Sequence, residues 1–228
     1  INANVFEKAS LLTSVTIPSS VKVIGTVKKS EGKGQDIDLV ASDVILLGDC
    51  PEDYPMQPKR HTLEYLRSVA YLRPRTNTFQ SVFRIRSAAA QSIHEYFRKN
   101  NYLYVHTPLI TTADCEGSDQ MFKLTTFDLN NIPKDKEGNV DFAQDFFNKP
   151  TNLTVSGQLN AETFAQAFRN TYTFGPTFRA ENSNTARHAA EFWMIEPEMA
   201  FADLKDDMEV AEAMLKYVIS YVMENAPE

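Results

Sequence analysis

The chain has 228 residues, of which 43% are apolar, and its formal net charge is −7 at pH 7. That length is sufficient for one full hydrophobic core and part of a second, whereas the acidic balance argues against a general nucleic-acid coat protein. The two cysteines, Cys50 and Cys115, lie far apart in the sequence and form no CxxC metal motif, so we expect reduced thiols in a cytoplasmic protein. No apolar run approaches the roughly 20 residues of a membrane span.

Residues 1–50 have the pattern of short β elements. Ser20–Val27 is typical of a strand, KKSEGKGQ is typical of a turn, and DIDLVASDVILLG predicts one or two further strands. Because so few strands cannot close a core alone, we interpret this segment as the later part of a small β domain. Residues 51–75 follow as a linker, which three prolines stiffen: Pro51, Pro55 and Pro58.

Basic side chains gather in and just after this linker. Between Pro51 and Asn100 there are nine Lys or Arg residues and four acidic residues. A polyanion such as RNA could bind there, although charge alone favours an ordinary solvated helix face.

Beyond the linker the hydrophobic pattern changes to a helical period. Thr62–Tyr71 predicts a short helix that ends at Arg73-Pro74. Asn77–Asn101 is the strongest predicted helix, because its apolar residues recur every three or four positions. The strand YLYVHTP follows and ends at Pro108.

The C-terminal part combines strands and helices. After a polar excursion at residues 128–150, TNLTVSG predicts a strand and QLNAETFAQAFRN a helix, with three residues expected to face inward: Leu159, Phe164 and Phe168. TYTFGPTFR and EFWMIEPEMAF then predict an antiparallel pair of strands, and Asp203 is expected to cap a last helix that runs to about Glu224.

The loop between the paired strands, within FRAENSNTARHAAEFW, carries an unusual set of side chains. The two-residue period of a strand allows an arginine, an acid and an aromatic ring to share one face of the hairpin. This set suits a nucleoside triphosphate, since a guanidinium pairs with phosphate and a ring stacks on a base. An exposed set of weak ion pairs explains the same pattern equally well. The glycine loops GxxxxGK[ST] and GxGxxG do not occur.

Several of these motifs resemble a known family. FRAEN…RHAAEF resembles the second signature of class II aminoacyl-tRNA synthetases, and the helix–strand–proline unit ending at Pro108 resembles the first signature, which builds their homodimer interface. TADCEGSDQMF, VSGQLNAETFA and TFGPTFRAENSNTARHAAEFWMIEPE closely resemble the aspartate–asparagine subgroup, and its asparaginyl members above all. Together these motifs extend the resemblance over essentially the whole chain.

The resemblance implies an α+β fold. Residues 76–228 would be an incomplete antiparallel-sheet catalytic core with the first two signatures. Residues 1–50 would be the C-terminal part of an OB-fold anticodon-binding barrel, and residues 51–75 the hinge between the two domains. The third signature, a glycine-rich strand and helix, does not follow Glu228, so the resemblance implies an excerpt of a longer enzyme.

The resemblance also implies a reaction and its participants: ATP and Mg²⁺ as cofactors, and asparagine and tRNA(Asn) as substrates. Arg179 would be the catalytic residue, binding the α-phosphate of ATP and the amino acid carboxylate. Phe192 would stack on adenine, and Glu181 would contact adenine or the terminal adenosine of the tRNA. Arg187 and His188 would contact the outer phosphates.

Four further positions are implied for the amino acid. Glu116 and Glu196 would hold its ammonium group, and Gln158 its backbone end. Aspartyl enzymes carry a lysine where this chain has Ala161, and the neighbouring Glu162 can accept a hydrogen bond from an asparagine amide and repel a carboxylate. Taken singly, each residue also fits a plainer role as a strand-end acid, a helix cap or a surface side chain.

Other functions compatible with these motifs are an aspartate-specific or non-discriminating synthetase, a paralogue that makes free asparagine, and a non-catalytic RNA-binding relative.

Overall fold

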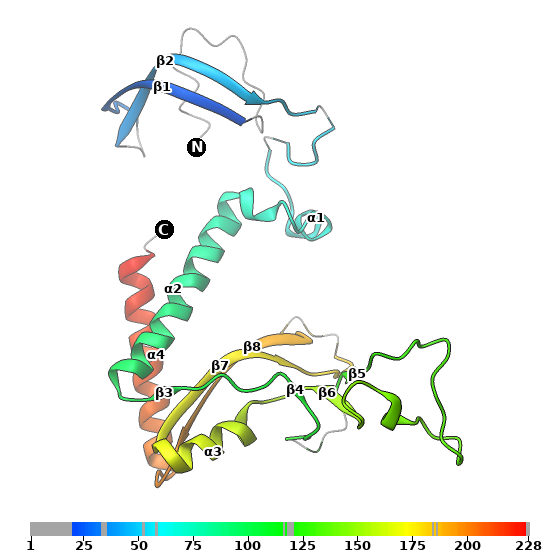
Figure 1. Cartoon of the computed structure of the whole chain (residues 1–228). Helices are drawn as coiled ribbons and strands as arrows, with labels where there is room; N and C mark the ends of the chain where they lie inside the picture. Colours follow the sequence, from blue (N-terminus) through cyan, green and yellow to red (C-terminus); the bar gives the residue numbers. More distant parts are fainter. Residues whose placement is uncertain are drawn as a thin grey trace. The chain divides into compact units, whose positions relative to one another are not determined.

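The computed structural model describes residues 20–32, 36–51, 53–57, 59–115, 117, 121–183, 185 and 187–226. The chain divides into two compact units, Ile1–Gln80 and Ser81–Glu228 (Figure 1). Within the described ranges, none of the helices combines the length and the apolar character that crossing a membrane requires. The candidate site belongs to the second unit.

The first unit contains an antiparallel hairpin of β1 (Ser20–Lys29) and β2 (Ile37–Gly48). DIDLVASDVILLG therefore forms a single strand. The pairing shifts register at Gly25, where a Cβ atom would lie 2.1 Å from the carbonyl oxygen of Val40, so only glycine fits this close approach of the two strands.

A short helix, α1 (Leu63–Ser68), follows in the same unit. Thr62 caps it, because its side-chain oxygen accepts a hydrogen bond from the backbone N–H of Tyr65 at 3.1 Å. The 3₁₀ helix η2 (Arg73–Arg75) contains Pro74, where the sequence predicts a break.

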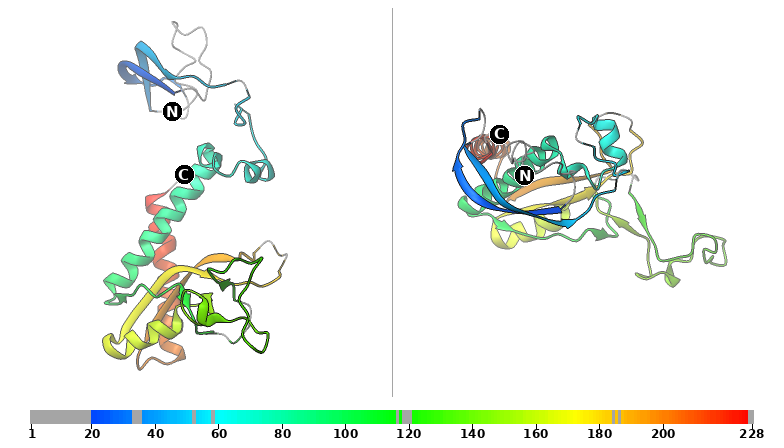
Figure 2. Two further views of the ribbon diagram at one scale, coloured as in Figure 1. Left: turned by 45° about the vertical axis from the view of Figure 1, so that its right-hand side comes forward. Right: turned by 90° about the horizontal axis from the view of Figure 1, so that it is seen from above.

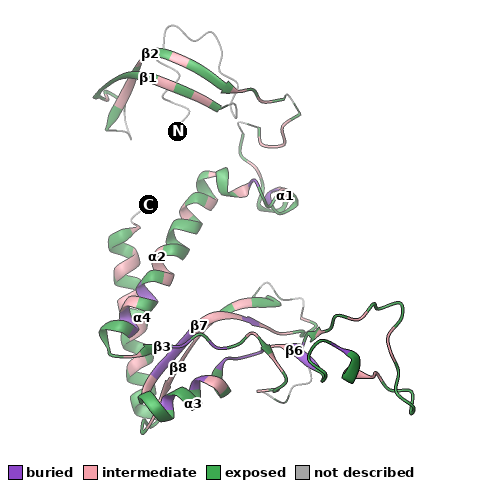
Figure 3. Ribbon diagram, viewed as in Figure 1, coloured by how far each residue is buried: buried purple, intermediate pink, exposed green. Residues whose placement is uncertain are grey.

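The second unit contains most of the long helix α2 (Asn77–Lys99) and all of α4 (Leu204–Asn225), and the two helices run alongside each other in Figures 1 and 2. Asp203 caps α4, as the sequence predicts, and the structure adds Asp206 as its partner in a capping box. Buried residues of α2 and β7 form the hydrophobic core with α4 packed against it: Ile93, Tyr96, Phe97 and Tyr172 (purple in Figure 3).

Two three-stranded sheets complete this unit. The first has the order β3 (Leu103–Tyr104), β7 (Asn170–Phe178), β8 (Glu191–Met199), with β3 parallel to β7 and β8 antiparallel to it. The second has the order β4 (Ile110–Thr111), β6 (Thr151–Leu153), β5 (Lys123–Leu124). The predicted hairpin of TYTFGPTFR and EFWMIEPEMAF is β7–β8.

The polar excursion between β5 and β6 contains the 3₁₀ helix η3 (Phe142–Gln144) and reaches away from the sheets (Figure 1). Asp145 anchors its base: this buried carboxylate accepts hydrogen bonds from the hydroxyl groups of Thr125 and Thr126 at 2.6 and 2.8 Å.

The β7–β8 hairpin has one apolar face and one polar face. Tyr172 and Phe174 of β7, with Ile195 of β8, pack against α2 and α4. Residues one position along each strand point the other way, and they include Thr173 and its pairing partner Glu196. The polar face is the one available to a ligand.

Helix α3 (Gln158–Phe168) packs on β7 and β8. The expectation that Leu159, Phe164 and Phe168 face inward is wrong, since all three are exposed. Ala161 and Ala165 are buried instead. Small side chains let the helix approach the sheet closely, so that the Thr171 hydroxyl lies 3.3 Å from the Ala161 carbonyl oxygen.

Candidate functional site

One end of the polar face carries Arg179 and Phe192. Arg179 follows the last residue of β7, and its backbone N–H donates to the carbonyl oxygen of Ala190 at 3.0 Å, which extends the hairpin by one rung. The central guanidinium carbon of Arg179 lies 5.5 Å from the centre of the Phe192 ring. A delocalised cation and an aromatic face therefore stand side by side.

The loop beyond them carries Glu181, Arg187 and His188, all exposed. The Nε2 atom of His188 lies 3.8 Å from a carboxylate oxygen of Glu181, and its Nδ1 atom lies 2.5 Å from the Thr185 hydroxyl. The structure thus brings Glu181 and His188 together at the rim of the hairpin, where an incoming polyanion could meet them.

Further along β8, Glu196 receives two hydrogen bonds from the segment between β6 and α3. The Ser156 hydroxyl donates to one carboxylate oxygen, and the backbone N–H of Gly157 donates to the other at 3.0 Å. Because Gly157 directly precedes α3, these bonds place the start of that helix beside Glu196.

The first turns of α3 carry the other residues predicted for the amino acid. The side-chain amide of Gln158 donates to a carboxylate oxygen of Glu162 at 2.9 Å, one helical turn away. The Cys115 sulfur lies 3.9 Å from the side-chain oxygen of Gln158. Glu116, the remaining residue predicted to contact the amino acid, lies outside the described residues.

Glu198 is an acidic residue near this site that our sequence reasoning missed. It lies two residues after Glu196 on the same face of β8. Burial, with a smaller contribution from the negative charges of Glu162, Glu196 and Asp207, raises the pKa of Glu198 from 4.5 to about 7. Near neutral pH a substantial fraction of Glu198 is therefore protonated.

Sequence reasoning also missed Ser156 and Gly157, although both lie in the quoted motif VSGQLNAETFA. A serine and a glycine directly before a helix usually indicate a turn. The pairing of both with a strand residue about 40 positions later is visible only in three dimensions.

The two groups of residues mark the ends of an elongated site. Phe192 and Glu196 are four residues apart on one face of β8, which corresponds to about 13 Å along an extended strand. A small cavity of about 20 Å³ lies between β7 and the start of α3, and Thr173, Thr177 and Glu196 are among its lining residues. The geometry suits a ligand with an aromatic and anionic end and a cationic end.

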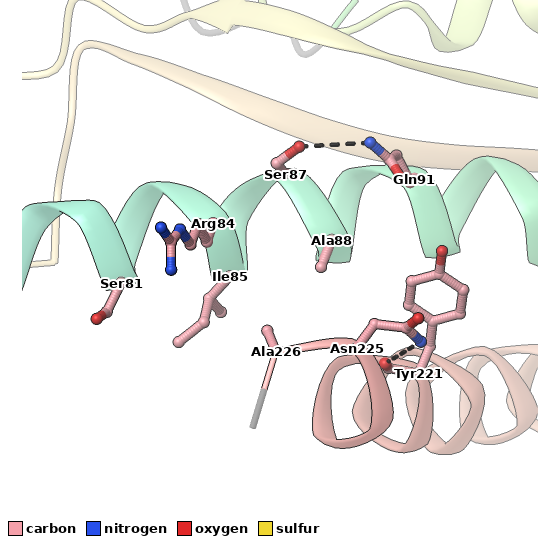
Figure 4. Close-up of a pocket in the computed structure, with 9 residues that line it drawn as sticks. All are labelled: Ser81, Arg84, Ile85, Ser87, Ala88, Gln91, Tyr221, Asn225 and Ala226. Atoms are coloured by element: carbon pink, nitrogen blue, oxygen red, sulfur yellow. Dashed lines mark hydrogen bonds between the residues drawn. The ribbon is translucent and has the colours of Figure 1, made fainter. Parts of the chain in front are cut away.

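A larger cavity, of about 360 Å³, lies between α2 and α4 (Figure 4). Its lining residues include Arg84, Gln91 and Tyr221, and none of the residues predicted for ATP or the amino acid. Among the described residues, no group of three or more His, Cys, Asp or Glu side chains is arranged to hold a metal ion.

Residues 62–228 match the family described as tRNA synthetases class II (D, K and N). The chain therefore belongs to this family, and the predicted resemblance is confirmed. It is 62% identical over 217 residues to the asparagine–tRNA ligase of Clostridium novyi (strain NT), covering 95% of this chain and 47% of that protein. It is 60% identical over 227 residues to the asparagine–tRNA ligase of Clostridium tetani (strain Massachusetts / E88), and this match covers 100% of this chain and 48% of that protein. The chain spans about half the length of these curated relatives.

Among solved structures, the chain is similar to the asparaginyl-tRNA synthetase from Pyrococcus horikoshii complexed with asparaginyl-adenylate. The TM-score is 0.75 at 26% sequence identity, over 92% of this chain and 44% of that one. This similarity and the family match confirm the predicted class II catalytic core fold with its antiparallel hairpin.

Proposed function

We propose that the protein is an asparagine–tRNA ligase, which activates asparagine with ATP and transfers it to tRNA(Asn). The observation that carries the proposal is the polar face of the β7–β8 hairpin, where Arg179 and Phe192 lie at one end and Glu196 at the other. The high identity to asparagine–tRNA ligases supports it.

At the nucleotide end, Phe192 stacks on adenine, and Arg179 binds the α-phosphate of ATP together with the amino acid carboxylate. Glu181 contacts the adenine or the terminal adenosine of the tRNA. Arg187 and His188 contact the outer phosphates. The proximity of Arg179 and Phe192 supports these roles. One ribose joins the base and the α-phosphate of a nucleotide, so the residues that bind these two groups must lie near each other.

At the other end, Glu196 and Glu116 hold the ammonium group of asparagine, and Gln158 binds its backbone end. Glu162 accepts a hydrogen bond from the side-chain amide and disfavours the carboxylate of aspartate. The contact between Gln158 and Glu162 supports a shared role, since one substrate could reach both.

The reaction has two steps. A carboxylate oxygen of asparagine attacks the α-phosphorus of ATP, and pyrophosphate leaves. The terminal ribose hydroxyl of the tRNA then attacks the acyl carbon, and AMP leaves. Both steps depend on positioning and charge stabilisation, so no nucleophilic side chain is needed. Mg²⁺ would neutralise phosphate charge, because phosphate oxygens and water are ligands that it prefers.

The remaining assignments follow from the same proposal. Residues 1–50 form part of an OB-fold anticodon-binding domain, residues 51–75 the hinge, and residues 76–228 part of the catalytic domain. Two copies associate through α2 and β3 up to Pro108, and the enzyme works in the cytoplasm. The β1–β2 hairpin supports the first assignment, because several of its apolar side chains are exposed and need further strands to cover them: Val27, Ile37, Leu46 and Leu47.

Amino-acid-dependent exchange between ATP and pyrophosphate, measured with the full-length protein, tests the proposal. We expect exchange with asparagine and charging of tRNA(Asn). Exchange with aspartate at comparable efficiency would contradict the specificity. Salt-sensitive tRNA binding without any exchange would instead favour a non-catalytic RNA-binding protein.

A further inference from the structure

We propose that Ser156 and Gly157 are positioning residues, which fix the carboxylate of Glu196 in one orientation for the substrate's ammonium group. We call the pair of donors, the Ser156 hydroxyl and the Gly157 N–H, the carboxylate clamp. This inference rests on the proposed function and adds to it the residues through which Glu196 acts.

The clamp engages both oxygens of Glu196 from one side. Ser156 donates to one oxygen and Gly157 to the other, the latter at 3.0 Å. A carboxylate has about four acceptor positions, so two bonds leave about two positions for a cationic ligand. Two bonds to two different oxygens also fix the plane of the group, which a single bond would leave free to rotate.

The Ser156 hydroxyl is itself oriented by its neighbours. The backbone N–H of Gln158 donates to the hydroxyl oxygen at 3.1 Å, so the hydroxyl proton is left to point toward Glu196. Thr154 holds the backbone of Ser156 from both sides, because its hydroxyl donates to the Ser156 carbonyl at 2.5 Å and lies 3.3 Å from the Ser156 nitrogen. Ser156 is only 7% exposed, which leaves little room for water to replace the hydroxyl.

The second donor requires glycine. A Cβ atom on residue 157 would lie 2.4 Å from the side-chain oxygen of Thr107 and 2.9 Å from the Cγ2 atom of Thr173. Of these two buried threonines, Thr107 follows β3 and Thr173 lies on β7, and their hydroxyl oxygens lie 3.2 Å apart. The backbone N–H therefore reaches Glu196 only where the chain has no side chain.

Orientation matters here because Glu196 has acidic neighbours. Glu198 lies two residues away on the same face, and the charge of Glu162 is close enough to raise the pKa of Glu198. Without fixed hydrogen bonds, the carboxylate of Glu196 could turn away from these acidic side chains toward solvent. The clamp keeps its charge on the polar face, where the ammonium group of an amino acid would bind.

The test is a double-mutant cycle between Ser156→Ala and Glu196→Gln in the full-length protein, followed by asparagine-dependent exchange between ATP and pyrophosphate. We expect Ser156→Ala to raise KM for asparagine on the order of 10-fold, the usual effect of losing a hydrogen bond to a charged group, with KM for ATP changed less than about 2-fold. In the Glu196→Gln background, Ser156→Ala should change KM for asparagine little further, because the two residues act as one unit.

Thr163→Ala is the matched control, since this exposed hydroxyl of α3 donates within its own helix, to the Asn160 carbonyl at 2.7 Å. If Ser156→Ala does not fold, Ser156→Cys takes its place, because it nearly keeps the side-chain size but offers only a weak donor. This variant is also expected to raise KM for asparagine. Equal effects of Ser156→Ala with and without Glu196→Gln, or equal rises of both KM values, would overturn the clamp while the proposed function stands. A wild-type protein without asparagine-dependent exchange would overturn both.

Discussion

The guanidinium group of Arg179 lies beside the ring of Phe192, with 5.5 Å between the guanidinium carbon and the ring centre. Arg179 directly follows β7 and Phe192 lies on β8, so the two residues flank the loop of one hairpin. A nucleotide whose base stacks on Phe192 would thus have its phosphates within reach of the Arg179 guanidinium.

Arg179→Ala is expected to lower the rate of adenylate formation by about 10²–10³, the usual loss when an enzyme is deprived of one transition-state charge stabiliser. Arg179→Lys should restore little of this rate, because an ammonium group cannot form the bidentate contact of a guanidinium. Single-turnover measurement with asparagine and ATP provides the rate. Lys216→Ala, on the exposed surface of α4, is the control. An unchanged rate in Arg179→Ala would exclude the catalytic role.

Neighbouring aromatic residues of β8 are expected to behave differently. Phe192 points to the polar face, whereas Trp193 contacts Phe174 at 5.6 Å between ring centres and has Arg86 4.8 Å above its ring, on the side of α2. Phe192→Ala should therefore raise KM for ATP about 5-fold or more through lost base stacking. Trp193→Phe should leave KM for ATP nearly unchanged, and equal effects of the two substitutions would contradict this division of faces.

The sequence predicts much of the second unit because its patterns are local. The three- and four-residue spacing in α2, the cap at Asp203 and the β7–β8 hairpin all depend on short-range periodicity or capping, and the structure has each of them. Arg179 and Phe192 meet because they flank one loop.

Other features depend on distant contacts, which periodicity does not contain. The apolar residues of α3 suggested the wrong inward face, because close approach of helix and sheet selected Ala161 and Ala165. The hydrogen bonds of Ser156 and Gly157 to Glu196 join separate parts of the chain. Glu198 resembles any strand acid until its burial and its acidic neighbours are known.

Glu198 should make the stability of the protein depend on pH. Burial and the charges of Glu162, Glu196 and Asp207 raise the pKa of Glu198 from 4.5 to about 7. Between these values the folded state binds more protons than the unfolded state, so the free energy of unfolding falls as the pH rises through this window. Glu198→Gln cannot ionise and should avoid this loss.

Thermal unfolding at about pH 5 and about pH 8 measures the effect. We expect Tm of Glu198→Gln, relative to wild type, to be higher at the upper pH than at the lower. Glu209→Gln removes one acidic charge from the exposed surface of α4 and serves as the control. A Tm difference that is the same at both pH values would exclude the raised pKa.

Amino acid selectivity is expected to depend on Glu162, an exposed residue on α3 that accepts a hydrogen bond from Gln158 at 2.9 Å. Glu162→Gln keeps the side-chain size but removes the charge that we propose repels a carboxylate. The ratio of kcat/KM for asparagine to that for aspartate should therefore fall on the order of 10-fold, about what one charge-assisted contact contributes. Exchange between ATP and pyrophosphate with each amino acid gives both constants, and Glu224→Gln on α4 is the matched control. If both variants kept the wild-type ratio, discrimination against aspartate would have to come from another residue.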